Sequence, residues 1–241
     1  MKIDETTILA EVAKAVEVFY ERVIASMDNL DIGKVMKRKN PYLYKVKGVT
    51  NVAEIVSATL SAFVSSSEET VFGDAFFEPI ALAVSGGTKS MAEGIDIEIH
   101  DAENHSVTVY AVKSGPNVFN AQSRKKQAQS FMNAQILARQ AKERFLAYVG
   151  YGYGTKKGKA KTPRIYQELA GKAFWTELTG DPDFYIKLIG YIGDTPQAHI
   201  QAFQESYDKA YNRLIRDFTS LFCKDDGSIY WEKLVRFNSG S

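Results

Sequence analysis

Two stretches that alternate apolar and polar residues lie close together near the middle of the chain. The first runs from Gly94 to Asp101 and the second from Val107 to Gly115, and both are rich in β-branched and aromatic residues. This alternation is typical of β-strands. The polar residues between the two stretches are turn formers, so the pattern predicts a β-hairpin over about residues 93–115.

Charged side chains occupy particular places on this predicted hairpin. Strand side chains repeat every second residue, so Asp96 and Glu98 are expected on one face. Lys113 lies near the end of the second strand, where loops begin and functional residues gather. Carboxylates and a lysine on paired strands could bind a divalent metal and activate water against a phosphodiester. The lysine could orient that water or offset charge in the transition state.

The composition excludes several other kinds of site. With 241 residues and 45% hydrophobic content, the chain can bury a large core. Its net charge is +1, so only local clustering could indicate a nucleic-acid partner. Because Cys223 is the single cysteine, a disulfide framework and a cysteine-rich zinc site are excluded. Only three histidines are present, so serine–histidine catalysis has little support. No apolar run has the length of a membrane span and no signal peptide is evident, so a cytoplasmic protein without a membrane partner is expected.

Helical periodicity occupies most of the remaining sequence. It predicts helices over residues 6–27, 52–65, 68–84, 165–180 and 196–223. A further helix is expected from the polar stretch after Pro116 to about Arg144, and a core strand over 145–151. Glu78 lies among apolar residues of its helix, where a carboxylate must be solvated, paired or bound to something. Because it precedes a strand with two further acids, it is a candidate third metal ligand. One domain is expected over 1–241, with a catalytic hairpin at about 93–115 and a helical part at about 165–238.

Three cationic segments could contact phosphates. They span residues 37–47, 116–127 and 151–164. Within the first, Pro41 is expected to end any nearby helix. The second lies at a predicted helix start, and the third is rich in glycine. The candidate DNA-binding residues are Lys37, Arg38, Lys39, Asn117, Asn120, Gln122, Arg124, Lys125, Lys156, Lys157, Lys159 and Lys161. The alternative for each segment is an ordinary solvated surface. The loop 86–90 lacks the spacing of a phosphate-binding loop, so no nucleotide cofactor is expected.

Several short blocks of sequence occur in an order that is found in a known family. The most specific are Glu-Gly-Ile-Asp-Ile-Glu at 93–98 and Tyr-Ala-Val-Lys-Ser-Gly-Pro-Asn at 110–117, and the others lie within 37–43, 70–73 and 174–186. Together these blocks resemble Type II restriction endonucleases of the PD-(D/E)xK superfamily. Within it, the chain is most similar to the TdeIII-like and PmeII-like enzymes.

The resemblance implies both a fold and an activity. The fold would be α/β, with a mixed central sheet flanked by helices, as in PD-(D/E)xK restriction endonucleases. The activity would be that of a Mg²⁺-dependent homodimer that cuts both strands of a short, GC-rich palindrome in double-stranded DNA. Carried over by position, Asp96 is the metal-binding acid, Lys113 is the motif lysine, and Glu78 matches the acid of the preceding helix.

The chain departs from the superfamily pattern at two positions. Ala111 stands where an acid two residues before the lysine is expected, and position 95 is Ile where Pro is expected. The missing ligand must then come from Glu78 or Glu98. Three alternatives follow: a catalytically inactive, sequence-specific DNA-binding protein in which Ala111 marks a lost site, a repair or recombination nuclease of the same superfamily, and a helical interaction protein with no DNA role.

Overall fold

The computed structural model describes residues 4–156 and 165–240, which group into two compact units. The first unit contains the described residues up to Phe19 and those from Glu69 to Pro196, and the second contains Tyr20–Glu68 and the residues from Gln197 onward. Two of these boundaries in the sequence fall within helices, namely α1 (Glu5–Asp28) and α4 (Val52–Phe72). The helix predicted over 6–27 is confirmed. The single endonuclease domain over 1–241 stays a prediction.

A five-stranded mixed sheet forms the centre of the first unit. Its strands lie side by side in sequence order, and they are β1 (Thr88–Lys89), β2 (Ile97–Asp101), β3 (Ser106–Lys113), β4 (Arg144–Tyr151) and β5 (Gln167–Ala170). The first three strands pair antiparallel and the last three pair parallel. The predicted hairpin is therefore β2–β3, and the α/β fold with a mixed sheet flanked by helices is confirmed.

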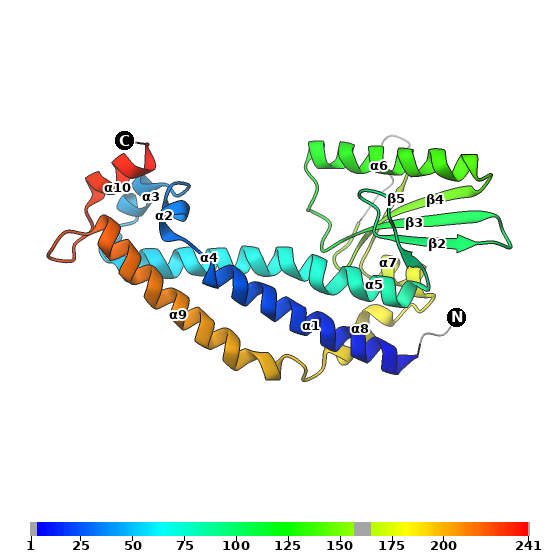
Figure 1. Cartoon of the computed structure of the whole chain (residues 1–241), viewed down its shortest axis with the longest axis horizontal. Helices are drawn as coiled ribbons and strands as arrows, with labels where there is room; N and C mark the ends of the chain where they lie inside the picture. The colour runs from blue at the N-terminus through cyan, green and yellow to red at the C-terminus, as the bar shows by residue number, and fades with distance from the viewer. Residues whose placement is uncertain (1–3, 157–164, 241) are drawn as a thin grey trace. The chain divides into compact units, whose positions relative to one another are not determined.

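Helices cover both faces of this sheet (Figure 1). On one face, α6 (Ala121–Gln140) provides the crossover that the parallel strands β3 and β4 require, and it packs on their apolar side chains. The other face carries a π-helical turn, η1 (Gly73–Phe77), followed by α5 (Glu78–Ser85) and α7 (Lys172–Thr179), with α8 (Phe184–Ile192) next in the chain. Buried aromatic side chains there include those of Phe76, Phe77, Phe174 and Trp175.

Two glycines permit this aromatic packing: Gly150 lies in β4, and Gly152 follows the end of that strand. A Cβ on Gly152 would lie 2.5 Å from the ring of Phe77, and a Cβ on Gly150 would collide with the ring of Phe174. The carbonyl of Gly152 also accepts a hydrogen bond from the indole of Trp175 at 2.8 Å. The backbone of this strand is therefore in direct contact with the aromatic layer.

Within the described residues, the helices of the second unit are joined by short loops and one isolated β-bridge, between Cys223 and Ile229. This unit contains the C-terminal part of α1, most of α4, and the helices α2 (Ile32–Met36), α3 (Pro41–Val46), α9 (Gln197–Phe222) and α10 (Trp231–Asn238). The guanidinium of Arg213 donates to the carbonyls of Met27 at 2.7 Å and Leu30 at 3.4 Å, which satisfies the end of α1. Across the described part of the chain, every helix is too short or too polar to span a membrane.

The predicted break between residues 65 and 68 is wrong. Helix α4 continues to Phe72, and the helix predicted over 68–84 divides into the end of α4, η1 and α5. The serines that suggested the break lie within the helix, where the hydroxyls of Ser67 and Ser26 of α1 are 3.0 Å apart. A polar partner on the neighbouring helix removes the cost of placing a hydroxyl in this position.

Three other boundaries also differ from the predictions. Pro41 begins α3 instead of ending a helix, because proline at the first helical position loses no hydrogen bond and Asn40 caps the turn. Helix α6 ends at Gln140, not near Arg144, and Lys142 then adopts a φ of 60° before β4. Residues 165–180 are not one helix: β5 pairs with β4 over Gln167–Ala170, and α7 follows.

Candidate active site

Asp96 and Lys113 meet at one end of the β2–β3 hairpin. The backbone N–H of Asp96 donates to the carbonyl of Tyr110 at 2.8 Å, so the pairing of the hairpin extends to this residue. Its carboxylate Oδ2 accepts a hydrogen bond from the N–H of Val112 at 2.7 Å and lies 3.5 Å from Lys113 Nζ. The structure therefore brings the predicted acid and the predicted lysine into contact.

A second lysine, Lys89, links Asp96 to Glu78. Its ammonium lies 3.8 Å from Oδ1 of Asp96 and forms an ion pair with the Glu78 carboxylate. Glu78 begins α5 directly after the π-helical turn, an element that is frequent at functional sites. The two carboxylates therefore share one cation, and each oxygen of Asp96 faces a different lysine.

Lys89 was missed in the sequence because β1 is only two residues long. A strand of this length carries no measurable alternation of apolar and polar residues. From the sequence, Lys89 belongs to a loop, and only its pairing with Ile97 of β2 places it in the sheet. The only signal in the sequence was its position close before the hairpin. Its neighbourhood is strongly acidic, and Asp74 of η1 adds to it.

The electrostatics of Lys89 reflect this neighbourhood. Burial alone would lower the pKa of its ammonium. The hydrogen bond to Glu78 and the negative charges of Glu78, Asp96 and Asp74 outweigh that effect and raise the pKa above its ordinary value. Lys89 is therefore a firmly charged cation among three carboxylates.

Glu98 has a different set of partners. Its Oε1 accepts a hydrogen bond from the hydroxyl of Ser90 at 2.6 Å, and its Oε2 lies 3.8 Å from Nε2 of His100. The other ring nitrogen of His100 lies 3.3 Å from Glu143. Within the described residues, no hydrogen bond or ion pair joins Glu98 to Asp96 or Lys113. The structure therefore groups Glu78, and not Glu98, with the predicted pair.

Ala111 lies in the apolar core. Its side chain is fully buried in the apolar cluster between the sheet and α6, which includes Val109 of β3 and Phe131 of α6. The place of the expected acid is thus filled by a small apolar side chain that belongs to this packing. A metal ligand in this chain has to come from another element.

The donor set around Lys89 fits a hard divalent cation. Mg²⁺ typically needs one or two protein carboxylates, with waters and substrate phosphates as its other ligands. Asp96 and Glu78 supply two, and the shared lysine ammonium shows that they accommodate positive charge between them. Within the described residues, no group of three or more acidic, histidine or cysteine side chains is placed to hold a metal. The fit therefore rests on the two carboxylates and the substrate.

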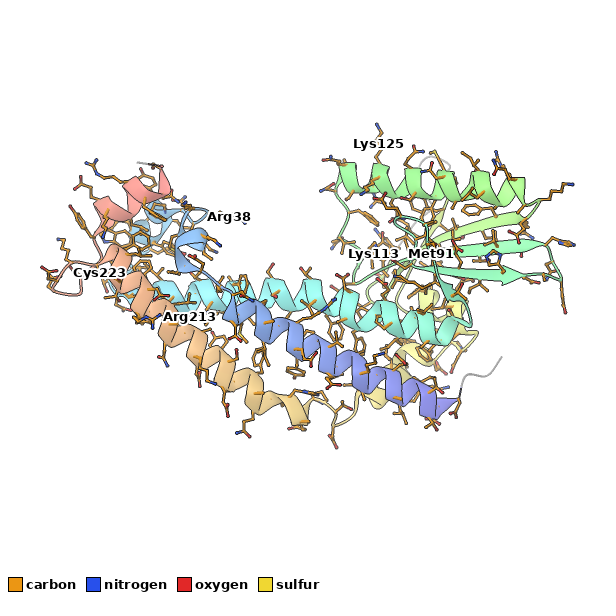
Figure 2. The ribbon with its side chains drawn as sticks, in the orientation of Figure 1. Arg38, Met91, Lys113, Lys125, Arg213 and Cys223 are labelled. Atoms are coloured by element: carbon orange, nitrogen blue, oxygen red, sulfur yellow. The ribbon has the colours of Figure 1, made fainter. Side chains whose placement is uncertain are left out.

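Two of the candidate DNA contacts in the second unit, Arg38 and Lys39, line an open groove. Lys34 also lines it, and its walls are formed by the end of α1, by α2 and by the middle of α4 (Figure 2 labels Arg38). Lys37 is exposed, and its ammonium lies over the ring of Phe237 at 5.5 Å. Three of the groove's lining residues are cations that the sequence places within six positions of one another.

The candidate contacts around the start of α6 divide into two kinds. Asn117, Gln122 and Lys125 are exposed, and Lys125 points away from the sheet (Figure 2). Asn120 instead caps the helix, because its side chain accepts a hydrogen bond from the N–H of Ser123 at 2.8 Å.

Arg124 also has an internal partner. It forms an ion pair with Glu168 of β5 at 2.6 Å, and Glu168 accepts a further hydrogen bond from the hydroxyl of Tyr151 at 2.7 Å. The exposed Lys156 lies 5.1 Å from the centre of the Tyr151 ring. Lys157, Lys159 and Lys161 lie outside the described residues.

A model of a known protein family matches residues 6–199 of this chain. The family is described as Type II restriction endonuclease EcoO109I, and the match includes the whole Glu78–Lys89–Asp96–Lys113 site. The chain belongs to the EcoO109I family of Type II restriction endonucleases. A search of curated proteins gave no significant match. The predicted Type II restriction endonuclease is thus confirmed, while the finer similarity to TdeIII-like and PmeII-like enzymes stays a prediction.

Membership of the EcoO109I family defines the chemistry at this site in general terms. Type II restriction endonucleases are site-specific nucleases that cleave DNA, so the bond to be broken is a phosphodiester. The carboxylates and lysines at the end of the β2–β3 hairpin are groups suited to that reaction.

Proposed function

We propose that this EcoO109I-family protein is a Mg²⁺-dependent Type II site-specific deoxyribonuclease that acts as a homodimer. Its substrate would be a short palindromic site in double-stranded DNA, and it would hydrolyse both strands. The observation that carries the proposal is the carboxylate of Asp96, with one oxygen 3.5 Å from Lys113 and the other facing the cation shared with Glu78. This constellation lies within the segment that matches the family model.

Asp96 and Glu78 are proposed to hold the metal. Mg²⁺, when bound, supplies Lewis-acid polarisation of the phosphate and lowers the pKa of coordinated water. Of the two glutamates that could complete the site, Glu78 is preferred because its carboxylate shares a cation with Asp96. Glu98 is proposed to support the hairpin through the hydrogen bond that it accepts from Ser90 and through its contact with His100.

Lys113 is proposed to act on the reacting groups. Its ammonium donates to the carbonyl of Val112 at 2.8 Å and lies beside Asp96, so its position is set by the strand that carries it. A cation held there can orient the attacking water and offset the negative charge that builds on the phosphate oxygens. Both tasks require a fixed ammonium and not a flexible surface lysine.

Exposed cations and amides are proposed to bind the DNA. Cations that neutralise phosphates provide affinity without sequence preference, whereas amides can read base edges. The proposed contacts with exposed side chains are Lys37, Arg38, Asn117, Gln122, Lys125 and Lys156, and the partly exposed Lys39 joins them. Lys157, Lys159 and Lys161 are proposed on their charge alone.

Digestion of a plasmid of known sequence tests this function. The purified protein should give discrete fragments with Mg²⁺ and intact plasmid with EDTA. A metal-dependent smear would instead favour the repair or recombination nuclease. Specific binding without cleavage under any divalent ion would favour the inactive DNA-binding protein.

A further inference from the structure

Lys89 is held at the site by the backbone around it. It ends the edge strand β1, where it pairs with Ile97, and Thr88 pairs with Glu98. This register places Lys89 opposite the residue that follows Asp96. Its position is therefore a consequence of the sheet, and not of a chance rotamer on a loop.

The ammonium of Lys89 is a positive charge at the two carboxylates that are proposed to bind the metal ion. It is a cation bound by the Glu78 carboxylate on one side and 3.8 Å from Oδ1 of Asp96 on the other. These are the two carboxylates proposed above to hold Mg²⁺. Without a cation between them, their like charges would repel each other.

The Lys89 side chain is also free to leave. It is 53% exposed, whereas the side chains of Glu78 and Asp96 are 26% and 15% exposed. An exposed lysine can exchange an ion pair for water at little cost, because the energy of such pairs is small.

We propose that Lys89 is an internal counter-ion that holds Glu78 beside Asp96 in the metal-free enzyme and that a divalent cation displaces it. The proposal rests on the function given above, since it concerns the same two carboxylates. In the metal-free site, the charges of Glu78 and Asp96 are balanced by Lys89 and Lys113. The divalent ion must therefore compete with an ammonium for its ligands, and Lys89 weakens metal binding while it keeps the ligands in position.

Calorimetric titration of Mn²⁺ into the DNA-free protein tests this competition. Lys89→Met should bind Mn²⁺ on the order of tenfold more tightly than the wild type, because a unit positive charge is removed from beside the ion. Lys89→Arg keeps the charge and should stay within about twofold of the wild-type affinity. The metal-free Lys89→Met protein should also melt at a lower temperature than the wild type, and Mn²⁺ should reverse that loss.

Lys187→Met is the matched control. Lys187 lies in the same unit, is 51% exposed and forms an ion pair with Asp181. Its replacement removes a similar surface charge that is not paired with Glu78 or Asp96. Its Mn²⁺ affinity should equal that of the wild type. If Lys89→Met binds Mn²⁺ no more tightly than the wild type, the counter-ion role is overturned. In that case, cleavage of DNA by the wild type would still support the proposed function. A wild type that neither binds Mn²⁺ nor cuts DNA would overturn both.

Discussion

The two oxygens of Asp96 have different neighbours, and this difference assigns roles to the surrounding residues. Oδ2 accepts from the N–H of Val112 and faces Lys113, whereas Oδ1 faces Lys89 and, through it, Glu78. One side of the carboxylate is thus bound to the strand that carries the motif lysine. The other side faces Lys89 and a second acid, and these two carboxylates are the ones proposed to hold the metal.

Substitution of either member of the central pair should abolish cleavage but not DNA binding. Asp96→Asn removes a charged ligand and Lys113→Met removes the fixed ammonium, and each should lower the cleavage rate by about 100-fold or more. Gel-shift affinity for the cognate site should change by only a few-fold. Asp101→Asn changes an exposed acid at the other end of β2 and is the control, with a rate near wild type. Full plasmid cleavage by Lys113→Met would refute its role.

The two glutamates should respond differently to the same change. Glu78→Gln should reduce cleavage about 100-fold, because it removes a proposed metal ligand. Glu98→Gln should retain most of the activity, since its partners are Ser90 and His100. Rates measured across a Mg²⁺ titration distinguish a lost ligand from a general defect. The opposite order of effects would identify Glu98 as the residue that replaces the acid missing at Ala111.

At the residue scale, the sequence indicated part of this arrangement. Asp96 and Lys113 could be paired because strand alternation and a recognisable turn place them on adjacent strands. Lys89 could not, because its strand is too short to carry a pattern. Arg124 was expected to contact DNA but has a partner on β5, and only the parallel pairing of β4 and β5 brings that partner near.

At the scale of elements, an ion-pair network connects the start of α6 to the sheet. Glu168 of β5 accepts hydrogen bonds from Arg124 of α6 and from Tyr151 of β4. Burial would raise the pKa of Glu168, but these two hydrogen bonds and the charge of Arg124 outweigh it and lower the pKa. The network therefore stabilises the fold only while Glu168 is ionised.

This lowered pKa gives a pH dependence with a definite sign. A group whose pKa is depressed in the folded state contributes stability above its unfolded value, here 4.5, and loses it as the pH falls through the folded value. Glu168→Gln should cost about 1 kcal/mol at pH 7, because it weakens two hydrogen bonds to a charged group. In urea denaturation, the difference from wild type should shrink below pH 4.5. A difference that grows on acidification would contradict this account.

The contact between β4 and α7 should not tolerate a methyl group. Gly150→Ala would place a Cβ into the ring of Phe174, and overpacking of this kind costs about 1–3 kcal/mol. Gly190→Ala in α8 is the control, because its added Cβ would meet no atom within 4 Å. Helix propensity makes that change neutral or slightly stabilising. Urea denaturation of the two variants gives the comparison, and equal stabilities would show that the aromatic layer can shift.

Most element types were predictable and several boundaries were not. The periodicity of α1 and the alternation of β2 and β3 are local signals, and they hold in the structure. Beyond Ser65, α4 continues with the hydroxyl of Ser67 next to that of Ser26 in α1, and β5 forms by pairing with β4. Both involve residues that are distant in sequence, so a short window does not encode them. The π-helical turn before Glu78 likewise has no signature in the periodicity.

At the scale of the whole molecule, the family match spans residues of both compact units. The proposed active site belongs to the first unit, while the cationic groove with Arg38 and Lys39 belongs to the second. DNA contacts are therefore proposed on both. This distribution agrees with a net charge of only +1, because the cations are clustered and not in excess.

The cationic groove should contribute to the salt dependence of DNA binding. Arg38→Ala and Lys39→Ala should each weaken binding at low salt and reduce the slope of log K against log salt by about 1, since each removes one phosphate contact. Arg216→Ala, which removes an exposed cation that is paired with Asp217, should leave the slope unchanged. Fluorescence anisotropy across a salt series provides the slopes. An unchanged slope for both groove variants would remove this groove from the DNA interface.

As proposed above, this member of the EcoO109I family cuts DNA at one defined palindrome by metal-dependent hydrolysis. The most direct test of this proposal is to digest bacteriophage-sized DNA of known sequence with the wild-type protein and Mg²⁺ and to sequence the fragment ends. The account predicts that all ends fall within one short palindromic sequence, and that Asp96→Asn yields no such ends. Ends distributed without a common sequence, or identical ends from Asp96→Asn, would contradict it.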